Sequence, residues 1–148
     1  MRNEPTLGDE DAQTAVAAIR DQLRKRGKAA VIAVADAQGE LLALLRLDGA
    51  SRAAIQIATN KAFTAARERK PTVDIGRDAR DARHGFDIAY YGDPRYVGWG
   101  GGLPVVHRGL VVGAVAVSGL PEDEDMQLAA VGVDAIHDLL RDDAKRGG

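Results

Sequence analysis

Residues 98–119 read GWGGGLPVVHRGLVVGAVAVSG, and this stretch constrains the fold more than any other part of the chain. A glycine-rich loop leads into a short apolar segment, which reaches a tight turn at Arg108-Gly109 and continues as almost unbroken valine and alanine. Two apolar segments around such a turn predict a β-hairpin with strands over residues 103–107 and 110–118. Because glycine tolerates positive φ and lets the backbone approach other groups closely, we expect a binding site near this loop.

A second hairpin is predicted in the first third of the chain. Residues 29–35 (AAVIAVA) are apolar on both sides of the strand alternation, which is typical of a buried strand. Turn-forming residues follow, and residues 41–47 (LLALLRL) then read as the partner strand. A short helix is the competing interpretation of LLALL, but the breaks at Gly39 and at Asp48-Gly49 favour the strand.

Helices are predicted before, between and after these hairpins. In the first helix, apolar side chains recur every three or four residues, acidic residues come first, basic residues come last, and Gly27 is a C-terminal cap. The second helix runs from the N-cap candidate Ser51 to Pro71, and a last helix begins near Pro121. The predicted helices cover residues 9–26, 51–70, 73–79 and the stretch from Pro121 to about residue 141.

These elements give the order α-β-β-α-loop-β-β-α, which predicts an α+β fold with an antiparallel sheet flanked by helices. The 148 residues suffice for one domain, with loose termini expected at residues 1–8 and 142–148. The strand at 110–117 is apolar on both faces. One face can take the helices, and the other needs cover from the long loop at residues 72–100 or from a second subunit.

Composition excludes several classes of protein. The chain has no cysteine, which excludes disulfides, thiolate metal sites and a thiol nucleophile. It carries 20 basic against 22 acidic residues without a basic stripe, which argues against nucleic acid as a partner. No N-terminal run is apolar enough for a signal peptide or a membrane span, so we expect a cytoplasmic protein that does not bind membranes.

Five short motifs follow one another along the chain: RLDGA at 46–50, NKAFTA at 60–65, GGLPV at 101–105, VGAVAVSG at 112–119, and Asp125 with Ala129 and Gly132. In order and spacing they resemble the GlcG/HbpS family of haem-degrading domains, which includes the C-terminal domain of PduO-type adenosyltransferases. The resemblance covers residues 10–140. It implies an antiparallel sheet of about five strands with flanking helices, assembly into homo-oligomers (dimers or larger), and haem as a cofactor.

The three histidines show no metal-ligand spacing, so a structural zinc site is not expected. His107 reads as an exposed turn residue, and His137 suits the C-terminal part of a helix. His84 lies in the long loop and is the candidate metal ligand if the protein binds haem. The chain has no CxxCH motif, so haem would be held without a covalent bond.

Charged residues in two of the motifs are candidates for ligand binding. Lys61 and Thr64 share one helical face. One interpretation is a solvated lysine beside a threonine in the helix interior, and the other is a pair of residues that lines a pocket. In the second case Lys61 supplies charge for a carboxylate or haem propionate, and Thr64 supplies a hydroxyl. Arg46 either binds an anion or locks the following loop through Asp48.

The glycine loop and its surroundings supply further candidates. The backbone N–H groups of Gly101 and Gly102 either bind an anion or belong to a flexible approach to the strand. Trp99 and three tyrosines lie near this loop in the sequence. They either cap the edge of the core or line a binding site for a flat ligand. Asp125 belongs to an acidic run that supports a helix start, and the family resemblance makes it a candidate site residue.

Three functions remain open from the sequence. The first is binding of haem, a related tetrapyrrole or another small ligand between the second helix, the glycine loop and the aromatic segment. The second is a catabolic enzyme acting on a carboxylate or carbonyl metabolite, in which Lys61 polarises an oxyanion and Asp48 or Asp125 acts as a base. The third is an assembly protein without a ligand of its own.

Overall fold

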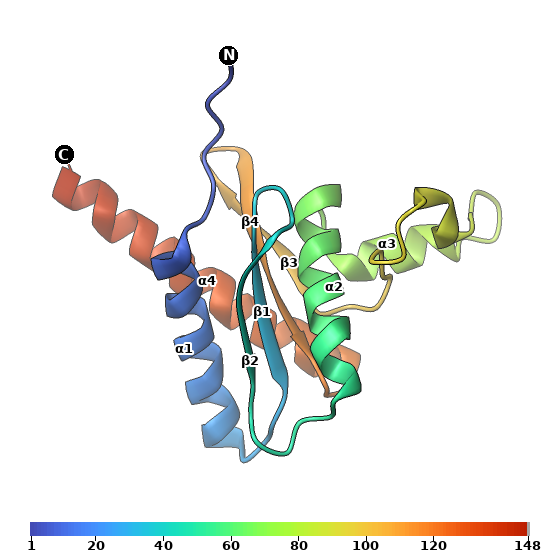
Figure 1. Ribbon diagram of the computed structural model, residues 1–148, viewed down its shortest axis with the longest axis horizontal. Helices are drawn as coiled ribbons and strands as arrows, with labels where there is room; N and C mark the ends of the chain where they lie inside the picture. The colour runs from blue at the N-terminus through green and yellow to red at the C-terminus, as the bar shows by residue number, and fades with distance from the viewer. Residues whose placement is uncertain (148) are drawn as a thin grey trace.

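A four-stranded antiparallel sheet forms the centre of the computed structural model, which describes residues 1–147 (Figure 1). Helices α1 and α4 cover one face of the sheet, and α2 covers the other. The elements in chain order are α1 (Asp9–Arg26), β1 (Val31–Asp36), β2 (Leu41–Arg46), α2 (Ala53–Glu68), α3 (Thr72–Ala79), the 3-10 helix η1 (Ile88–Tyr91), β3 (Gly102–His107), β4 (Leu110–Ser118) and α4 (Glu122–Gly147).

Both predicted hairpins are confirmed, and they join through β1 and β4 to give the strand order β2-β1-β4-β3. Arg108 and Gly109 have φ values of 50° and 77° in the turn between β3 and β4. Two successive positive φ values are the signature of the primed turns that match the twist of a hairpin. The expected count of about five strands is too high. The sheet in residues 1–147 has four strands, two from each hairpin.

Strand β1 separates two different packing layers, because its side chains alternate between the faces of the sheet. Ile32 and Val34 face α1 and α4 within a core of large aliphatic side chains. Val31, Ala33 and Ala35 face α2, whose contacting residues are also alanines. Small side chains on both surfaces let α2 lie close against the sheet, so any long side chain on this face of α2 must extend past the sheet's end.

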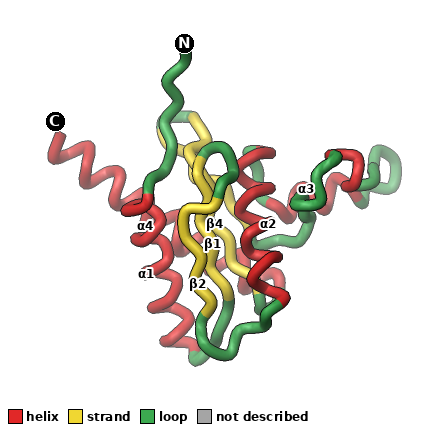
Figure 2. Tube along the Cα trace, viewed as in Figure 1, coloured by secondary structure: helices red, strands yellow, loops and turns green. Residues whose placement is uncertain are grey.

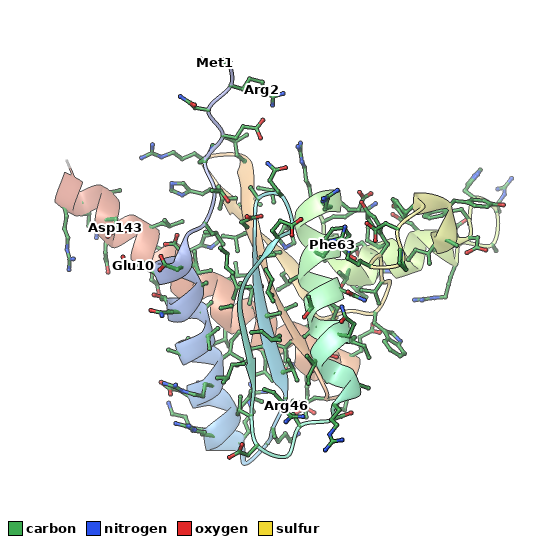
Figure 3. All side chains as sticks on the ribbon, viewed as in Figure 1. Met1, Arg2, Glu10, Arg46, Phe63 and Asp143 are labelled. Carbon is green, nitrogen blue, oxygen red and sulfur yellow. The ribbon has the colours of Figure 1, made fainter. Side chains whose placement is uncertain are left out.

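Residues 72–101 form a projection that leaves the body of the molecule and carries α3 and η1 (Figures 1 and 2). Phe63 of α2, labelled in Figure 3, anchors it through contacts with two side chains. The Tyr96 ring meets Phe63 edge-on with 5.3 Å between centroids, and the Arg95 guanidinium lies 3.9 Å from the centre of the Phe63 ring. The short helix predicted at 73–79 is confirmed as α3, whereas η1 was not predicted.

Several boundaries differ from the sequence predictions. Helix α2 begins at Ala53, after the expected N-cap Ser51. The expected loose arm at residues 1–8 is attached at Leu7, which is buried and donates its backbone N–H to the carbonyl of Val112. The expected loose tail is helical up to Gly147, and residue 148 lies outside the described residues. No helix in residues 1–147 is both long and apolar enough to cross a membrane.

Candidate functional site

A cavity of about 260 Å³ opens between the first turns of α2 and α4, at the end of the sheet where β4 stops and β3 begins. Its walls combine small apolar groups with a few polar side chains, which is typical of a site for a small ligand. The lining residues are Ser51, Ala53, Ala54, Ile57, Lys61, Trp99, Gly100, Ser118, Gly119, Leu120, Glu122 and Asp125.

An ion pair between Lys61 and Asp125 lies in the wall of this cavity. Lys61 Nζ donates to Asp125 Oδ2 at 3.2 Å and to the carbonyl of Val117 at 3.0 Å, and both charged residues are only 2% exposed. Asp125 Oδ1 accepts a hydrogen bond from the backbone N–H of Leu120. An ammonium has three N–H donors, so two are used by the protein and the third is left for a ligand or water.

The sequence places the Lys61 ammonium here through its neighbours. Ala58 and Ala62 hold the α2 backbone close to the sheet, so the lysine side chain runs along this surface to the end of β4. Gly101, with φ of 129°, lies directly beside it, and a Cβ there would stand 2.7 Å from Lys61 Nζ. Gly101 therefore makes room for the ammonium, and the interpretation of Lys61 as a solvated residue is wrong.

Burial acts on both members of the pair in opposite senses. It lowers the pKa of Lys61, although the negative charges of Asp125 and Glu122 oppose this effect. It raises the pKa of Asp125, although Lys61 opposes this effect. Both shifts favour the neutral forms, because removal from water disfavours charge. With two carboxylates against one ammonium, the cavity favours a neutral ligand over an anionic one.

Trp99 is the aromatic side chain that reaches the cavity, and it remains 59% exposed. The same residue also lines a second hollow of about 440 Å³ between α3 and the segment before β3, together with Phe86, Ile88 and Val97. Trp99 thus stands between two neighbouring spaces. A flat ligand that extends out of the first cavity would meet its indole ring.

Two of the three tyrosines of the projection, Tyr91 and Tyr96, contact one another instead of lining the cavity, whereas Tyr90 is exposed. Tyr91 and Tyr96 stack with their ring centroids 4.2 Å apart, and Tyr96 leans on Phe63. Burial and a hydrogen bond to Glu68 raise the pKa of Tyr91 to about 12. Of the two interpretations offered for these rings, capping of the core describes their arrangement.

Thr64 and Gly102 also have structural partners. Thr64 Oγ1 donates to the carbonyl of Arg95 and accepts the N–H of Val97, at 3.2 and 3.1 Å. The backbone N–H of Gly102 donates to Thr72 Oγ1 at 2.9 Å. Neither residue lines the cavity, and both hold the projection to the body of the molecule.

Arg46 lies at the same end of the sheet as the cavity, near the start of α2 (Figure 3). Val31 pairs with Arg46 on one side and with Ser118 on the other. Arg46 and the cavity residue Ser118 are therefore two strands apart, about 10 Å, and point to the same face. Arg46 is exposed, as is Asp48, and residues 1–147 contain no ion pair between them.

The three histidines are not brought together. His84 is exposed in the turn after α3, which forms the tip of the projection (Figure 1), and it lines neither hollow. The imidazole of His137 is within 2.9 Å of the carbonyl of Val106. Within the part of the chain that the structure describes, no three His, Asp or Glu side chains gather as a metal site.

Sequence reasoning missed several lining residues, notably Ser118 and Glu122. Glu122 reads as an acidic residue that supports the start of a helix, and Ser118 has no partner nearby in the sequence. The signal that points to them is their position, because the end of β4 and the start of α4 flank one short turn. Side chains on both sides of such a turn face the same end of the sheet.

Comparison with known proteins confirms the resemblance. The model of the haem-degrading, HbpS-like protein family matches residues 7–134, and the chain therefore belongs to this family. Escherichia coli K12 GlcG is 36% identical over 118 residues, which make up 80% of this chain and 85% of GlcG. Klebsiella pneumoniae ORFY has a TM-score of 0.88 at 28% identity, covering 93% of this chain and 94% of ORFY. PduOC, solved as a haem complex, shares the fold with a TM-score of 0.81 at 21% identity, covering 88% and 94% of the two chains.

Replacing Thr64 by valine tests its role as an anchor of the projection. Thr64→Val leaves the N–H of Val97 without its acceptor, so we expect a loss of about 1–3 kcal/mol in the free energy of unfolding. Thr59→Val is the control, because Thr59 bonds only the carbonyl of Ile55 in its own helix. Urea unfolding measures both. Equal, small losses in the two variants would contradict the anchoring role.

Replacing Asp125 by asparagine tests the buried pair. The variant leaves Lys61 charged and uncompensated, so we expect a loss of about 3–5 kcal/mol in unfolding free energy at neutral pH. Lys61 in the folded variant would then give up its proton at a lower pH than Lys61 in the unfolded chain. The loss of unfolding free energy therefore shrinks as the pH rises toward the ordinary lysine pKa.

Glu124→Gln is the control for this pair, because Glu124 pairs with exposed Lys28 from the same helix. We expect it to cost less than about 1 kcal/mol. Urea unfolding between pH 7 and 10 measures both variants, and a pH-independent loss for Asp125→Asn would argue against a buried ammonium.

Proposed function

We propose that this protein binds haem or a related tetrapyrrole at the cavity of Lys61 and Asp125. The observation that carries the proposal is an apolar-walled cavity that contains a buried ammonium and has the exposed indole of Trp99 at its side. Membership of the haem-degrading, HbpS-like family and the likeness to the PduOC–haem complex support haem as the first ligand to test.

The size of the cavity sets how a macrocycle would lie. At about 260 Å³ it falls below the roughly 300–1,000 Å³ of sites that enclose a drug-sized ligand. One edge of a tetrapyrrole would enter the cavity, and the rest would extend over Trp99 toward the second hollow. Stacking on an indole suits the flat face of such a ring.

The charges in the cavity suggest where the carboxylates of haem would lie. The charge of Lys61 is already balanced by Asp125, so it is a hydrogen-bond donor more than a free cation. Arg46 is exposed on the same face, two strands from the cavity. A guanidinium binds carboxylates in a two-pronged geometry, so the haem propionates would meet Arg46.

A haem titration tests this proposal through two independent signals. We expect a saturable shift of the Soret absorbance band and, with the same midpoint, quenching of Trp99, which is the single tryptophan of the chain. Lys61→Met and Arg46→Gln should each weaken binding about tenfold, or about 1.4 kcal/mol.

Arg24→Gln is the matched control, because Arg24 is an exposed arginine in α1 on the other face of the sheet. It should leave the affinity for haem unchanged. A Soret shift that does not saturate, or that is the same in Lys61→Met as in the parent protein, would contradict binding at this cavity.

His84 would act from another copy of the chain. It lies in the exposed turn after α3 and lines neither hollow of its own copy. An imidazole there would reach the iron only across an interface between subunits, which fits a homo-oligomer with Trp99 and Tyr90 near the contact.

Sedimentation velocity and His84→Ala test this arrangement together. We expect a dimer or larger assembly, and His84→Ala should alter the Soret band of bound haem while the sedimentation coefficient stays unchanged. A monomer that binds haem saturably would contradict ligation across subunits. Lys70, a half-buried cation that pairs with Asp78 of α3 and lines neither hollow, provides the control Lys70→Ala, which should change neither readout.

A further inference from the structure

Lys61 differs in its environment from the other lysines of the chain. Lys25 and Lys145 are exposed at helix surfaces, whereas Lys61 is 2% exposed and lines a cavity. Its Nζ has the carbonyl of Val117 at 3.0 Å and a carboxylate at 3.2 Å, with one N–H left over. An amine held in this way has a defined direction of approach for a reacting group in the cavity.

The other walls of the cavity suit a reaction that releases water. Ala54, Ile57 and Leu120 supply apolar surface close to the amine. A lysine in apolar surroundings is a nucleophile because its neutral form is accessible near neutral pH. Burial acts in this direction on Lys61 and lowers its pKa, whereas Lys25 lies exposed on a helix surface.

We propose that Lys61 forms a Schiff base with a small uncharged aldehyde or ketone in this cavity. This activity goes beyond haem binding and does not depend on it, because it needs only the cavity, the amine of Lys61 and the carboxylate of Asp125.

The proton balance of the step uses Asp125. The carboxylate takes one proton from the Lys61 ammonium, across the 3.2 Å that separates the two groups, and leaves a neutral amine. The amine nitrogen attacks the carbonyl carbon, and the nitrogen's second proton moves to the oxygen to give a neutral carbinolamine. Asp125 then returns its proton to the hydroxyl, which leaves as water while the C=N⁺ bond forms. Atoms and charge balance, and the step requires no oxidant or reductant.

Size and charge define the class of carbonyl compound. A cavity of about 260 Å³ suits a compound of a few carbon atoms. The Lys61–Asp125 pair carries no net charge before or after the proton passes between them, so Glu122 leaves the cavity negative, which repels a 2-oxo acid and accepts a neutral carbonyl compound. The carboxylate metabolites considered from the sequence are therefore disfavoured in this reaction.

Reductive trapping tests the proposal. The intact protein is incubated at pH 7.5 with butanal and cyanoborohydride, without haem, and labelled peptides are quantified by mass spectrometry. We expect at least tenfold faster labelling at Lys61 than at the exposed Lys25 and Lys145. With 2-oxobutanoate, the anionic counterpart, Lys61 should label at least tenfold more slowly than with butanal.

Glu122→Gln sharpens the test, because it removes one negative charge from an exposed cavity residue that makes no hydrogen bond to the buried pair. Any effect on the Lys61 amine is common to both carbonyl compounds and cancels in the ratio of their labelling rates. It should raise labelling by 2-oxobutanoate relative to butanal by severalfold. Labelling of Lys61 no faster than that of Lys25 and Lys145 would overturn the proposal. The haem titration is a separate measurement, so failure of one does not imply failure of the other.

Discussion

The ion pair between Lys61 and Asp125 connects the two layers of this fold. Lys61 comes from α2 on one face of the sheet, Asp125 comes from α4 on the other, and they meet beside the last residues of β4. Burying two charges is costly unless each is paired and hydrogen-bonded, and here both conditions are met. The pair thereby ties the middle of α2 to the start of α4 in the wall of a small cavity, which is where the candidate chemistry lies.

Most of the fold was predictable because its signals are local. The turn at Arg108-Gly109, the C-terminal cap at Gly27 and the helix end before Pro71 each depend on a few adjacent residues. The projection was less predictable, since its position depends on contacts between distant residues. Thr64 illustrates this: its hydroxyl anchors Arg95 and Val97, some thirty residues away, and nothing in its own helix indicates that role.

The sequence predicted several residues of the candidate site, but it did not predict which of them contact one another. The family motifs named Lys61, Asp125 and Gly101, which the structure brings together at one end of the sheet. Their pairing joins residues 64 positions apart, so spacing along the chain carries no sign of it. His84 shows the opposite case, because a loop histidine suits a haem ligand by its chemistry, while the fold of one copy leaves it in an exposed turn outside both hollows.

The central claim is that Lys61 is a buried amine with access to a ligand, and NMR titration of the lysine side chains tests it most directly. The chain has five lysines, and Lys61→Arg assigns the Lys61 signal. We predict that the Lys61 signal titrates below the ordinary lysine pKa and shifts when haem or butanal is added. A Lys61 signal that titrates at or above the ordinary lysine pKa, with no ligand-dependent shift, would contradict a buried amine that is open to a ligand.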